Sequence, residues 1–262
     1  MTVMMPYWEV HDRGHGPHIL MVHGFLSSRA QWRSNLDALT QFSRPVLVEL
    51  LGHGRSPSPE DPSVYAVSAY MQAFEAIRQD LGAERWLMCG QSFGAGLAIQ
   101  YALEYPERTM GLVFTNSNSA LSAPNDPERA ASQDERARAI TAGGKQALWD
   151  LRIHPRNAKR FPEEIKAELV ADADMLAPEG ILRSIAWTSP DLALAHRLCE
   201  ISVPTLFVNG VWEKRFQPLR DKIAAGIPGV IVADYPGGHS INIEAAEGFE
   251  ASVRTFVTGL AK

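Results

Sequence analysis

Short apolar runs alternate along the chain with longer stretches in which apolar residues recur every three or four positions. The short runs are bounded by turn residues and predict strands at residues 19–22, 46–50, 86–89, 110–115, 205–208 and 230–235, with an edge strand at Tyr7–Val10. The longer stretches predict helices at residues 31–41, 68–81, 95–105, 219–225 and 245–260. This alternation predicts an α/β fold with a mostly parallel central sheet and helices on both faces.

Residues 117–199 interrupt the alternation. They contain no run typical of a strand and are rich in Arg, Glu, Ala and Pro. We therefore expect a core built from residues 1–116 and 200–262, with residues 117–199 as a helical lid inserted before the last two strands. Such a lid would cover the C-terminal edge of the sheet, where open α/β sheets bind ligands. The alternative is a helical addition with no function of its own.

A serine follows directly after the apolar run at residues 86–89, in the sequence Gly90-Gln91-Ser92-Phe93-Gly94. A strand, a G-x-S-x-G turn and a helix in this order predict a nucleophile elbow, which leaves the serine exposed at the head of the helix. The flanking glycines have a steric reason, because a Cβ on either side of the turn would collide with the neighbouring strand and helix. Ser92 is therefore the candidate nucleophile.

A serine hydroxyl needs a general base, and the base needs an acid that orients it. His239 follows the last predicted strand in a glycine-containing loop that returns to the same sheet edge, so it is the candidate base. Glu213 is the first carboxylate after the preceding strand and is the candidate acid, whereas Asp221 lies too far into the next helix. The alternative for Glu213 is a surface glutamate beside Lys214 and Arg215.

An oxyanion hole requires two backbone N–H groups directed at the developing negative charge. The residue after the nucleophile, Phe93, would supply one of them. Phe25, in His23-Gly24-Phe25 after an early strand, would supply the other and line the pocket with its ring. We interpret His23 as a structural residue that shapes this loop.

The composition and charge of the chain serve mainly to exclude classes of binding partner. The chain has 262 residues, 45% hydrophobic and 21% charged, with a net charge of −5. This charge argues against binding to nucleic acid or to an anionic membrane surface. We expect a cytoplasmic monomer or homodimer that binds a small-molecule substrate, because no signal peptide or membrane-spanning run is evident. The two cysteines, Cys89 and Cys199, are expected to be buried thiols.

Metals and organic cofactors have no support in the sequence. The histidines are not spaced from carboxylates or thiolates as metal ligands usually are, and no H-E-x-x-H occurs. We therefore expect no metal and no cofactor. Three histidines near the N-terminus are expected to be solvated: His11, His15 and His18.

Taken together, these segments resemble the α/β-hydrolase superfamily over nearly the whole chain. The resemblance rests on HGF at residues 23–25, LGHGRS at 51–56, the elbow at 90–94, YPER at 105–108, and GH at 238–239 with Glu244 downstream. It implies the α/β-hydrolase fold and a nucleophile, acid and base in the order Ser92, Glu213, His239. The fold hosts many chemistries, so it does not identify the substrate.

Within the superfamily the chain is similar to the menaquinone-pathway synthases, notably at residues 23–32, 51–59, 126–129 and 210–216. This resemblance implies a lyase that eliminates pyruvate from a succinyl-hydroxycyclohexene intermediate with the same three residues. The chain differs at Glu213, where that family usually carries Asp, and at Gly96, where it usually carries an arginine for a substrate carboxylate. Losing that guanidinium predicts a substrate with fewer anionic groups.

Three functions are therefore compared. The first is a serine hydrolase that cleaves a small carboxylic ester, lactone or related acyl compound through a Ser-His-Glu triad. The second is a lyase or C–C bond hydrolase that uses the triad as a proton-abstracting base, and the third is a ligand receptor on a hydrolase scaffold. In the expected lid, Trp149, Trp187 and Arg129 are candidates for contact with substrate, against the alternative of packing or solvated surface.

Overall fold

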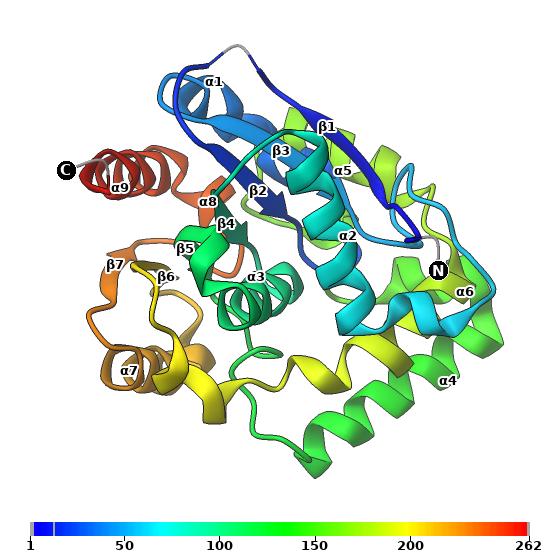
Figure 1. The fold of residues 1–262 in the computed structure, drawn as a ribbon. Helices are drawn as coiled ribbons and strands as arrows, with labels where there is room; N and C mark the ends of the chain where they lie inside the picture. The colour runs from blue at the N-terminus through cyan, green and yellow to red at the C-terminus, as the bar shows by residue number, and fades with distance from the viewer. Residues whose placement is uncertain (1–2, 13, 261–262) are drawn as a thin grey trace.

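Seven strands form one sheet in this computed structural model, which describes residues 3–12 and 14–260. The spatial order is β1-β3-β2-β4-β5-β6-β7, and all neighbours pair in parallel except β1 with β3 (Figure 1). The strands are β1 Tyr7–Val10, β2 His18–Val22, β3 Arg44–Glu49, β4 Trp86–Gly90, β5 Thr109–Thr115, β6 Thr205–Gly210 and β7 Ile231–Tyr235. The prediction of a mostly parallel α/β sheet is confirmed.

Helices cover both faces of this sheet (Figure 1). One face carries α2 (Val67–Asp80), α3 (Phe93–Glu104) and α7 (Gln217–Gly226), and the other carries α1 (Leu36–Leu39) and α9 (Ala246–Gly259). Because successive strand residues point to opposite faces and both faces are covered, the inner strands are apolar at most positions and divide between two cores.

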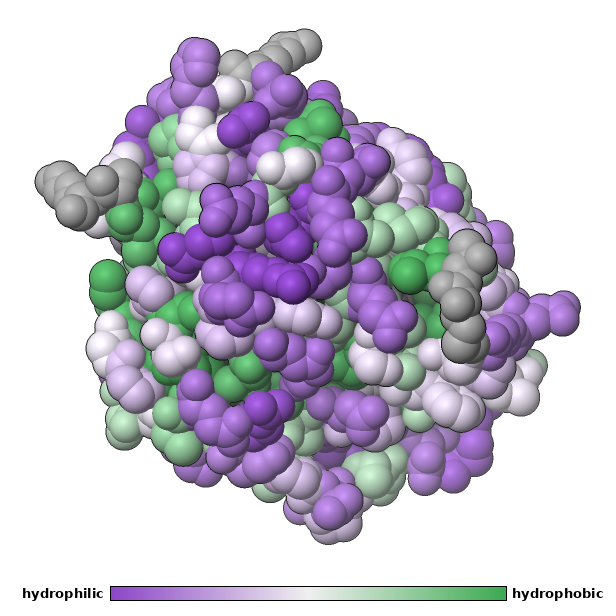
Figure 2. All heavy atoms as spheres, in the orientation of Figure 1, coloured by the Kyte–Doolittle hydropathy of each residue, from purple (hydrophilic) through white to green (hydrophobic). Residues whose placement is uncertain are grey.

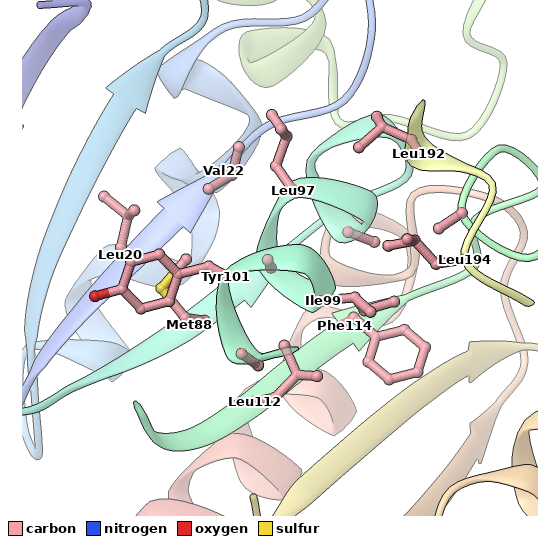
Figure 3. Packing of buried hydrophobic residues seen from close by; sticks show 14 of the residues in the cluster. Leu20, Val22, Met88, Leu97, Ile99, Tyr101, Leu112, Phe114, Leu192 and Leu194 are labelled. Carbon is pink, nitrogen blue, oxygen red and sulfur yellow. The ribbon is translucent and has the colours of Figure 1, made fainter. Parts of the chain in front are cut away.

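Strand β2 shows this division clearly. Leu20 and Val22 belong to the core beneath α2 and α3, where Tyr101 also packs (Figure 3). Ile19 and Met21 belong to the core beneath α1 and α9. All four strand residues are fully buried, so β2 and its neighbours form a rigid platform whose C-terminal ends can hold side chains in fixed positions.

One predicted helix has a different form in the structure. Residues 31–41 are divided between a 3₁₀ helix at Arg29–Asn35 and the short helix α1. Two polar side chains in this segment bond to Asn242 of α8 (Ile241–Glu244): Gln31 Nε2 reaches its Oδ1 at 2.9 Å and Asn35 Nδ2 reaches its carbonyl oxygen at 2.9 Å. These tertiary contacts account for the tighter winding better than local helix propensity does.

Residues 117–199, called the inserted segment below, lie between β5 and β6 and contain helices and loops only. Its α-helices are α4 (Pro127–Asp150), α5 (Glu163–Ala173) and α6 (Pro178–Arg183). Helix α4 is broken at Gly144, whose φ of +54° lies in the left-handed region that glycine adopts easily. The inserted segment has a small apolar core, which includes Ile140, Leu148 and Ile181 and incorporates Leu26 from the loop after β2.

Hydrogen bonds join the inserted segment to the loops at the C-terminal edge of the sheet. Ala177 N–H donates to Gly52 O at 3.0 Å, and Thr188 Oγ1 donates to Tyr65 O at 2.6 Å. These bonds and the shared apolar contacts place the inserted segment over this edge, which is where the chemistry of the elbow is found.

The surface is mixed in polarity. On the face shown in Figure 2, hydrophilic residues prevail and hydrophobic residues form separated patches. In the part of the chain that the structure describes, no helix is both long enough and apolar enough to span a membrane.

Candidate active site

The turn from β4 into α3 has the geometry of a nucleophile elbow. Ser92 has φ +51° and ψ −111°, a strained conformation for a residue with a side chain. The glycines around it are needed for packing. A Cβ on Gly90 would lie 2.6 Å from the Ala95 Cα, and one on Gly94 would lie 2.6 Å from the His23 carbonyl oxygen. Both positions therefore exclude any larger residue, as the sequence predicts.

Polar contacts hold the elbow in place. Ser117 Oγ, just beyond β5, donates to the carbonyl oxygen of Ser92 at 2.6 Å. Gln91 N–H donates to Val22 O at 3.0 Å, which ties the turn to the end of β2. The Gln91 side chain donates to His239 O at 3.2 Å, so the turn is also joined to the loop after β7. The strained backbone is thus fixed from three sides.

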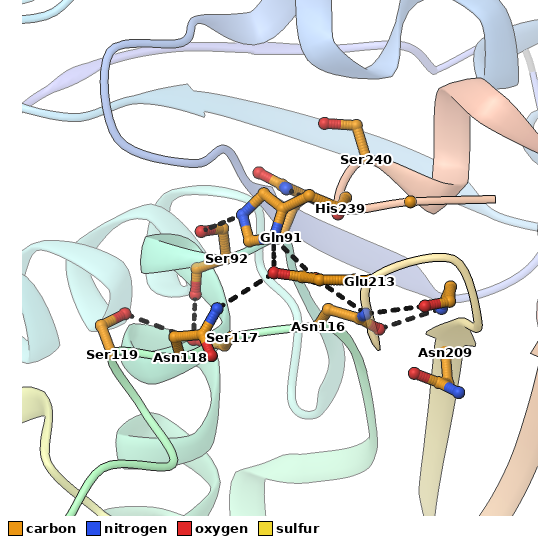
Figure 4. A network of polar contacts seen from close by, with 12 residues as sticks. Gln91, Ser92, Asn116, Ser117, Asn118, Ser119, Asn209, Glu213, His239 and Ser240 are labelled. Atoms are coloured by element: carbon orange, nitrogen blue, oxygen red, sulfur yellow. Dashed lines mark hydrogen bonds and ion pairs between the residues drawn. The ribbon is translucent and has the colours of Figure 1, made fainter. Parts of the chain in front are cut away.

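Ser92, His239 and Glu213 come together at the C-terminal ends of β4, β7 and β6 (Figure 4). Ser92 Oγ lies 2.7 Å from His239 Nε2. The other ring nitrogen, Nδ1, lies 3.0 Å from Glu213 Oε2 and 3.2 Å from Oε1. These distances allow a proton to pass from the hydroxyl to the imidazole while the carboxylate faces the opposite nitrogen.

Two asparagines after β5 anchor Glu213 (Figure 4). Asn116 Nδ2 donates to Oε2 at 2.9 Å, and Asn118 Nδ2 donates to Oε1 at 3.0 Å. Burial by itself would raise the pKa of Glu213, but the hydrogen bonds from His239, Asn116 and Asn118 lower it below its usual value. The carboxylate is therefore ionised at neutral pH and held by both of its oxygens.

Within the part of the chain that the structure describes, the backbone N–H groups of Phe25 and Phe93 make no hydrogen bond. Phe93 is the first residue of α3, so its N–H points out of the helix start and has no intrahelical acceptor. Among the described residues, no hydrogen bond is found for the N–H of Phe25. The ring of Phe25, in the loop after β2, and the ring of Phe93, in the elbow, lie 5.5 Å apart between centroids. Both N–H groups are therefore available to an acceptor.

Two buried histidines shape the loops behind these amides. His23 Nε2 accepts a hydrogen bond from Leu50 N–H at 3.0 Å, and His53 Nε2 accepts one from Leu26 N–H at 3.3 Å. Their rings lie 5.2 Å apart. Burial lowers the pKa of His23 to about 3 and that of His53 to about 4, so both are neutral acceptors.

Two of the expectations about side-chain exposure are wrong. His18 is only 8% exposed because it begins β2, an inner strand of the sheet. Cys199 is exposed, whereas Cys89 in β4 is buried as expected, and both are free thiols. In both cases the local sequence does not show which face of an element is covered.

Two cavities meet at Ser92. The smaller, of about 580 Å³, extends past Trp212 and the loop at residues 152–161. The larger, of about 800 Å³, extends along α4 past Arg129 and Arg136. Both are lined by Phe25, Asn118, Ile153 and His239 as well as Ser92. A molecule whose reacting carbon lies at Ser92 could therefore extend in two directions.

The predicted pocket residues are found in different places. Arg129 lines the larger cavity. Trp149 and Trp187 line neither cavity: Trp149 packs under Arg156, with the guanidinium carbon 6.0 Å from the ring centroid, and Trp187 is 46% exposed. The tryptophan that lines the smaller cavity is instead Trp212, directly before Glu213.

Sequence reasoning missed Asn116 and Asn118, and it did not distinguish Arg136 from the other arginines of the expected lid. The two asparagines follow a predicted strand, and polar residues at the carboxyl end of a parallel strand are a signal that could have identified them. Arg136 is one of eight arginines in residues 117–199, and its helical spacing from Arg129 would have separated it from the others. Within the residues that the structure describes, no group of three or more His, Cys, Asp or Glu side chains is placed to hold a metal ion.

Gly96 is buried in α3 and packs against the inserted segment. A Cβ at this position would lie 3.1 Å from the Leu192 Cβ. Any longer side chain would have to displace Leu192, which belongs to the main apolar core.

Comparisons with known proteins agree with this architecture. A family model described as the alpha/beta hydrolase fold matches residues 17–246. A Bacillus subtilis (strain 168) protein, provisionally named 2-succinyl-6-hydroxy-2,4-cyclohexadiene-1-carboxylate synthase, is 24% identical over 92% of this chain and 90% of its own length. A Variovorax paradoxus (strain S110) protein, provisionally named carbamate hydrolase RutD, is 27% identical over 96% of this chain and 95% of its own length.

A solved structure shows the same fold. The structure of MenH from S. aureus superimposes with a TM-score of 0.85, covering 98% of this chain and 100% of that one at 21% identity. The resemblance to the menaquinone-pathway synthases is thus seen in both sequence and structure. From the family match over residues 17–246 and the sheet topology, we conclude that this chain belongs to the alpha/beta hydrolase fold family.

Proposed function

We propose that this protein is a serine hydrolase that cleaves a small carboxylic ester, lactone or related acyl compound. The observation that carries the proposal is the continuous relay from Glu213 through His239 to Ser92, with a 2.7 Å contact between the serine oxygen and the ring nitrogen. A nucleophile, a base within hydrogen-bond distance and a third group that orients the base are the requirements of acyl transfer.

In the first step, Ser92 Oγ attacks the carbonyl carbon of the substrate and its proton moves to His239 Nε2. The carbonyl oxygen takes the negative charge, and the N–H groups of Phe25 and Phe93 would stabilise it. The tetrahedral intermediate then collapses: the bond to the leaving oxygen breaks, that oxygen takes the proton from Nε2, and an acyl-serine remains.

In the second step, water hydrolyses the acyl-serine. His239 Nε2 takes a proton from the water, whose oxygen attacks the acyl carbon, and Ser92 leaves with that proton restored. The carboxylate of Glu213 stabilises the imidazolium in both steps and keeps the Nδ1 proton directed toward itself. The hydrogen bonds from Asn116 and Asn118 support this role because they favour the ionised carboxylate.

We assign the inserted segment as the lid of this site. It contributes Arg129, Arg136 and Ile153 to the cavities that meet at Ser92, whereas the reacting groups come from the sheet edge. The substrate would therefore be selected by the inserted segment and cleaved by the core. The provisional name of the V. paradoxus relative, a carbamate hydrolase, is consistent with acyl chemistry of this kind.

A second candidate function is a lyase or C–C bond hydrolase in which His239, through Ser92, abstracts a proton from carbon. It is favoured by the similarity to the B. subtilis protein provisionally named as a synthase. A ligand receptor on the same scaffold is the third alternative.

The test is a series of p-nitrophenyl esters of increasing acyl length, measured with the intact chain and with Ser92→Ala. Many turnovers per molecule that vanish in Ser92→Ala, with unchanged circular dichroism, are the expected result. Ser252→Ala, on α9 away from both cavities, is the control and should retain full activity. One turnover or none by a folded protein would overturn the hydrolase proposal and favour the receptor or lyase.

A further inference from the structure

One face of α4 forms a wall of the larger cavity at Ser92. Arg129, Ser132, Gln133 and Arg136 all line this cavity, and their spacing of three and four residues places them on the same side of the helix. Arg138 lies off this face and is exposed. The first half of α4 therefore presents two guanidinium groups to the space beside the nucleophile.

The two arginines differ in their partners. Arg129 donates through Nη2 to the carbonyl oxygen of Ser189, and Gln133 Nε2 donates to the hydroxyl of the same serine at 2.6 Å. The nearby carboxylate of Asp126 caps the start of α4, accepting hydrogen bonds from Glu128 N–H at 3.0 Å and Arg129 N–H at 3.2 Å. Arg129 is thus bound within the inserted segment.

Arg136 has no such partner. Among residues 3–12 and 14–260, no ion pair or hydrogen bond is found for its guanidinium. Its guanidinium lies over the ring of Phe25, with the guanidinium carbon 5.7 Å from the ring centroid. Burial lowers the pKa of Arg136, and no carboxylate offsets this effect. The charge is therefore partly removed from water without receiving a counterion from the protein.

A desolvated cation without a counterion is costly, and proteins normally pair it. Here the partly buried guanidinium faces a cavity that also contains Arg129, Arg215 and Lys222, against the acidic Asp126 and Glu128. The guanidinium without a counterion therefore lines the same cavity as Ser92. A planar guanidinium binds a carboxylate through two parallel hydrogen bonds, which gives both affinity and orientation.

We propose that Arg136 is a specificity-determining residue that binds a free carboxylate of the substrate. The substrate class is then an acyl compound with one additional carboxylate, such as a half-ester of a short dicarboxylic acid. This inference rests on the proposed hydrolase function and refines it. Phe25 connects the two parts of the site, because its ring contacts Arg136 on one side and Phe93 of the elbow on the other.

The test compares matched substrates that differ only in charge. Mono-p-nitrophenyl esters of succinate and glutarate are measured against their neutral methyl-capped diesters, and butyrate esters of 4-hydroxybutyrate against those of butanol. The intact chain is expected to prefer the carboxylated member of at least one pair. Arg136→Met should lower kcat/KM for that member roughly 10- to 100-fold, while the neutral member changes less than about threefold.

Control variants distinguish carboxylate binding by Arg136 from the proposed hydrolase function. Arg138→Met, on the exposed side of the same helix, should leave the preference unchanged, and Arg136→Lys should restore part of it. Glutarate should inhibit hydrolysis of the neutral ester by the intact chain but not by Arg136→Met. Activity that depends on Ser92 without any carboxylate preference, or a preference that survives in Arg136→Met, would overturn the inference and leave the hydrolase intact. Activity that survives Ser92→Ala would overturn the hydrolase itself.

Discussion

Asn118 donates a hydrogen bond to Glu213, with Nδ2 3.0 Å from the same Oε1 that lies 3.2 Å from His239 Nδ1. The longer side chain of a glutamate has one more rotatable bond than an aspartate, so it needs more restraint to stay in one position. Asn116 supplies a second restraint at Oε2. The acid of the relay is thus positioned by side chains from the neighbouring strand end as well as by its own turn.

Replacing Glu213 by Gln should lower kcat roughly 100- to 10,000-fold, because an amide neither stabilises the imidazolium nor holds the required tautomer. The matched control is Asp221→Asn, at an exposed residue in α7 that pairs with Arg220. Steady-state hydrolysis of a p-nitrophenyl ester measures both. Equal losses in the two variants, or no loss in Glu213→Gln, would contradict the assignment of the acid.

Replacing Asn118 by Leu should shift the acidic limb of the activity profile to higher pH. The pKa of Glu213 in the folded protein lies below the usual carboxyl value. Its negative charge therefore persists as the pH falls and is lost only when the pH reaches this lowered pKa. Removing a donor raises the folded pKa, and the loss then begins at a higher pH. The readout is kcat/KM between pH 4 and 8.

Asn118→Asp tests the effect of residue 118 on the pKa of Glu213 by introducing a negative charge. A second carboxylate beside Glu213 raises the pKa of the pair further, so the shift should exceed that of the leucine variant. A profile that keeps its shape in both variants, with only a uniform drop in rate, would show that Asn118 acts on structure alone.

Gly94→Ala should destabilise the fold by about 3 kcal/mol, because the new Cβ would overlap the carbonyl oxygens of Val22 and His23 at the end of β2. In an ordinary helix the same change stabilises. Gly259, the last residue of α9, is the matched control, because a Cβ there meets nothing within 4 Å. Urea unfolding of the two variants should therefore give effects of different size, and similar values would contradict the packing argument.

The buried histidines predict acid sensitivity. His23 and His53 have pKa values of about 3 and about 4 in the folded protein, against 6.5 when unfolded. Below pH 6.5 the unfolded chain binds protons that the folded chain does not, so stability falls as pH falls toward the folded values. Each histidine should contribute a loss of about 2 kcal/mol between pH 7 and 5.

His53→Gln isolates one of these contributions, because the amide oxygen can still accept from Leu26 N–H but does not titrate in this range. The difference in unfolding free energy between pH 7 and pH 5 should shrink by about 2 kcal/mol in the variant. If the intact chain and the variant lose the same free energy, the histidine is not the source of the acid sensitivity.

The sequence predicted the sheet well because the inner parallel strands are mostly apolar and end at recognisable turns. The run at residues 86–89 corresponds to β4 at Trp86–Gly90, and the helix predicted at residues 68–81 corresponds to α2 at Val67–Asp80. The segment at residues 31–41 was less predictable, because contacts to Asn242, more than 200 positions away, shape it. Long-range contacts of this kind have no local signal.

The candidate site shows the same limit. Ser92, His239 and Glu213 each follow a strand, so fold topology alone predicts that they meet. The partners of Glu213 depend on how the β5 and β6 ends face each other, 97 positions apart for Asn116. Which arginine faces the cavity depends on how α4 is rotated against the core. Trp149 and Trp187 line neither cavity at Ser92, and their positions depend on how the helices of the inserted segment pack.

The face of α4 at Arg129 and Arg136 has a consequence for how such a protein can change over generations. Two of the groups proposed to make and break bonds, Ser92 and Glu213, follow the buried strands β4 and β6, where most substitutions would disturb the sheet. The α4 residues that line the cavity come from a helix with few buried positions. Substitutions along that helix can therefore redirect the protein toward new compounds while its reacting groups stay as they are.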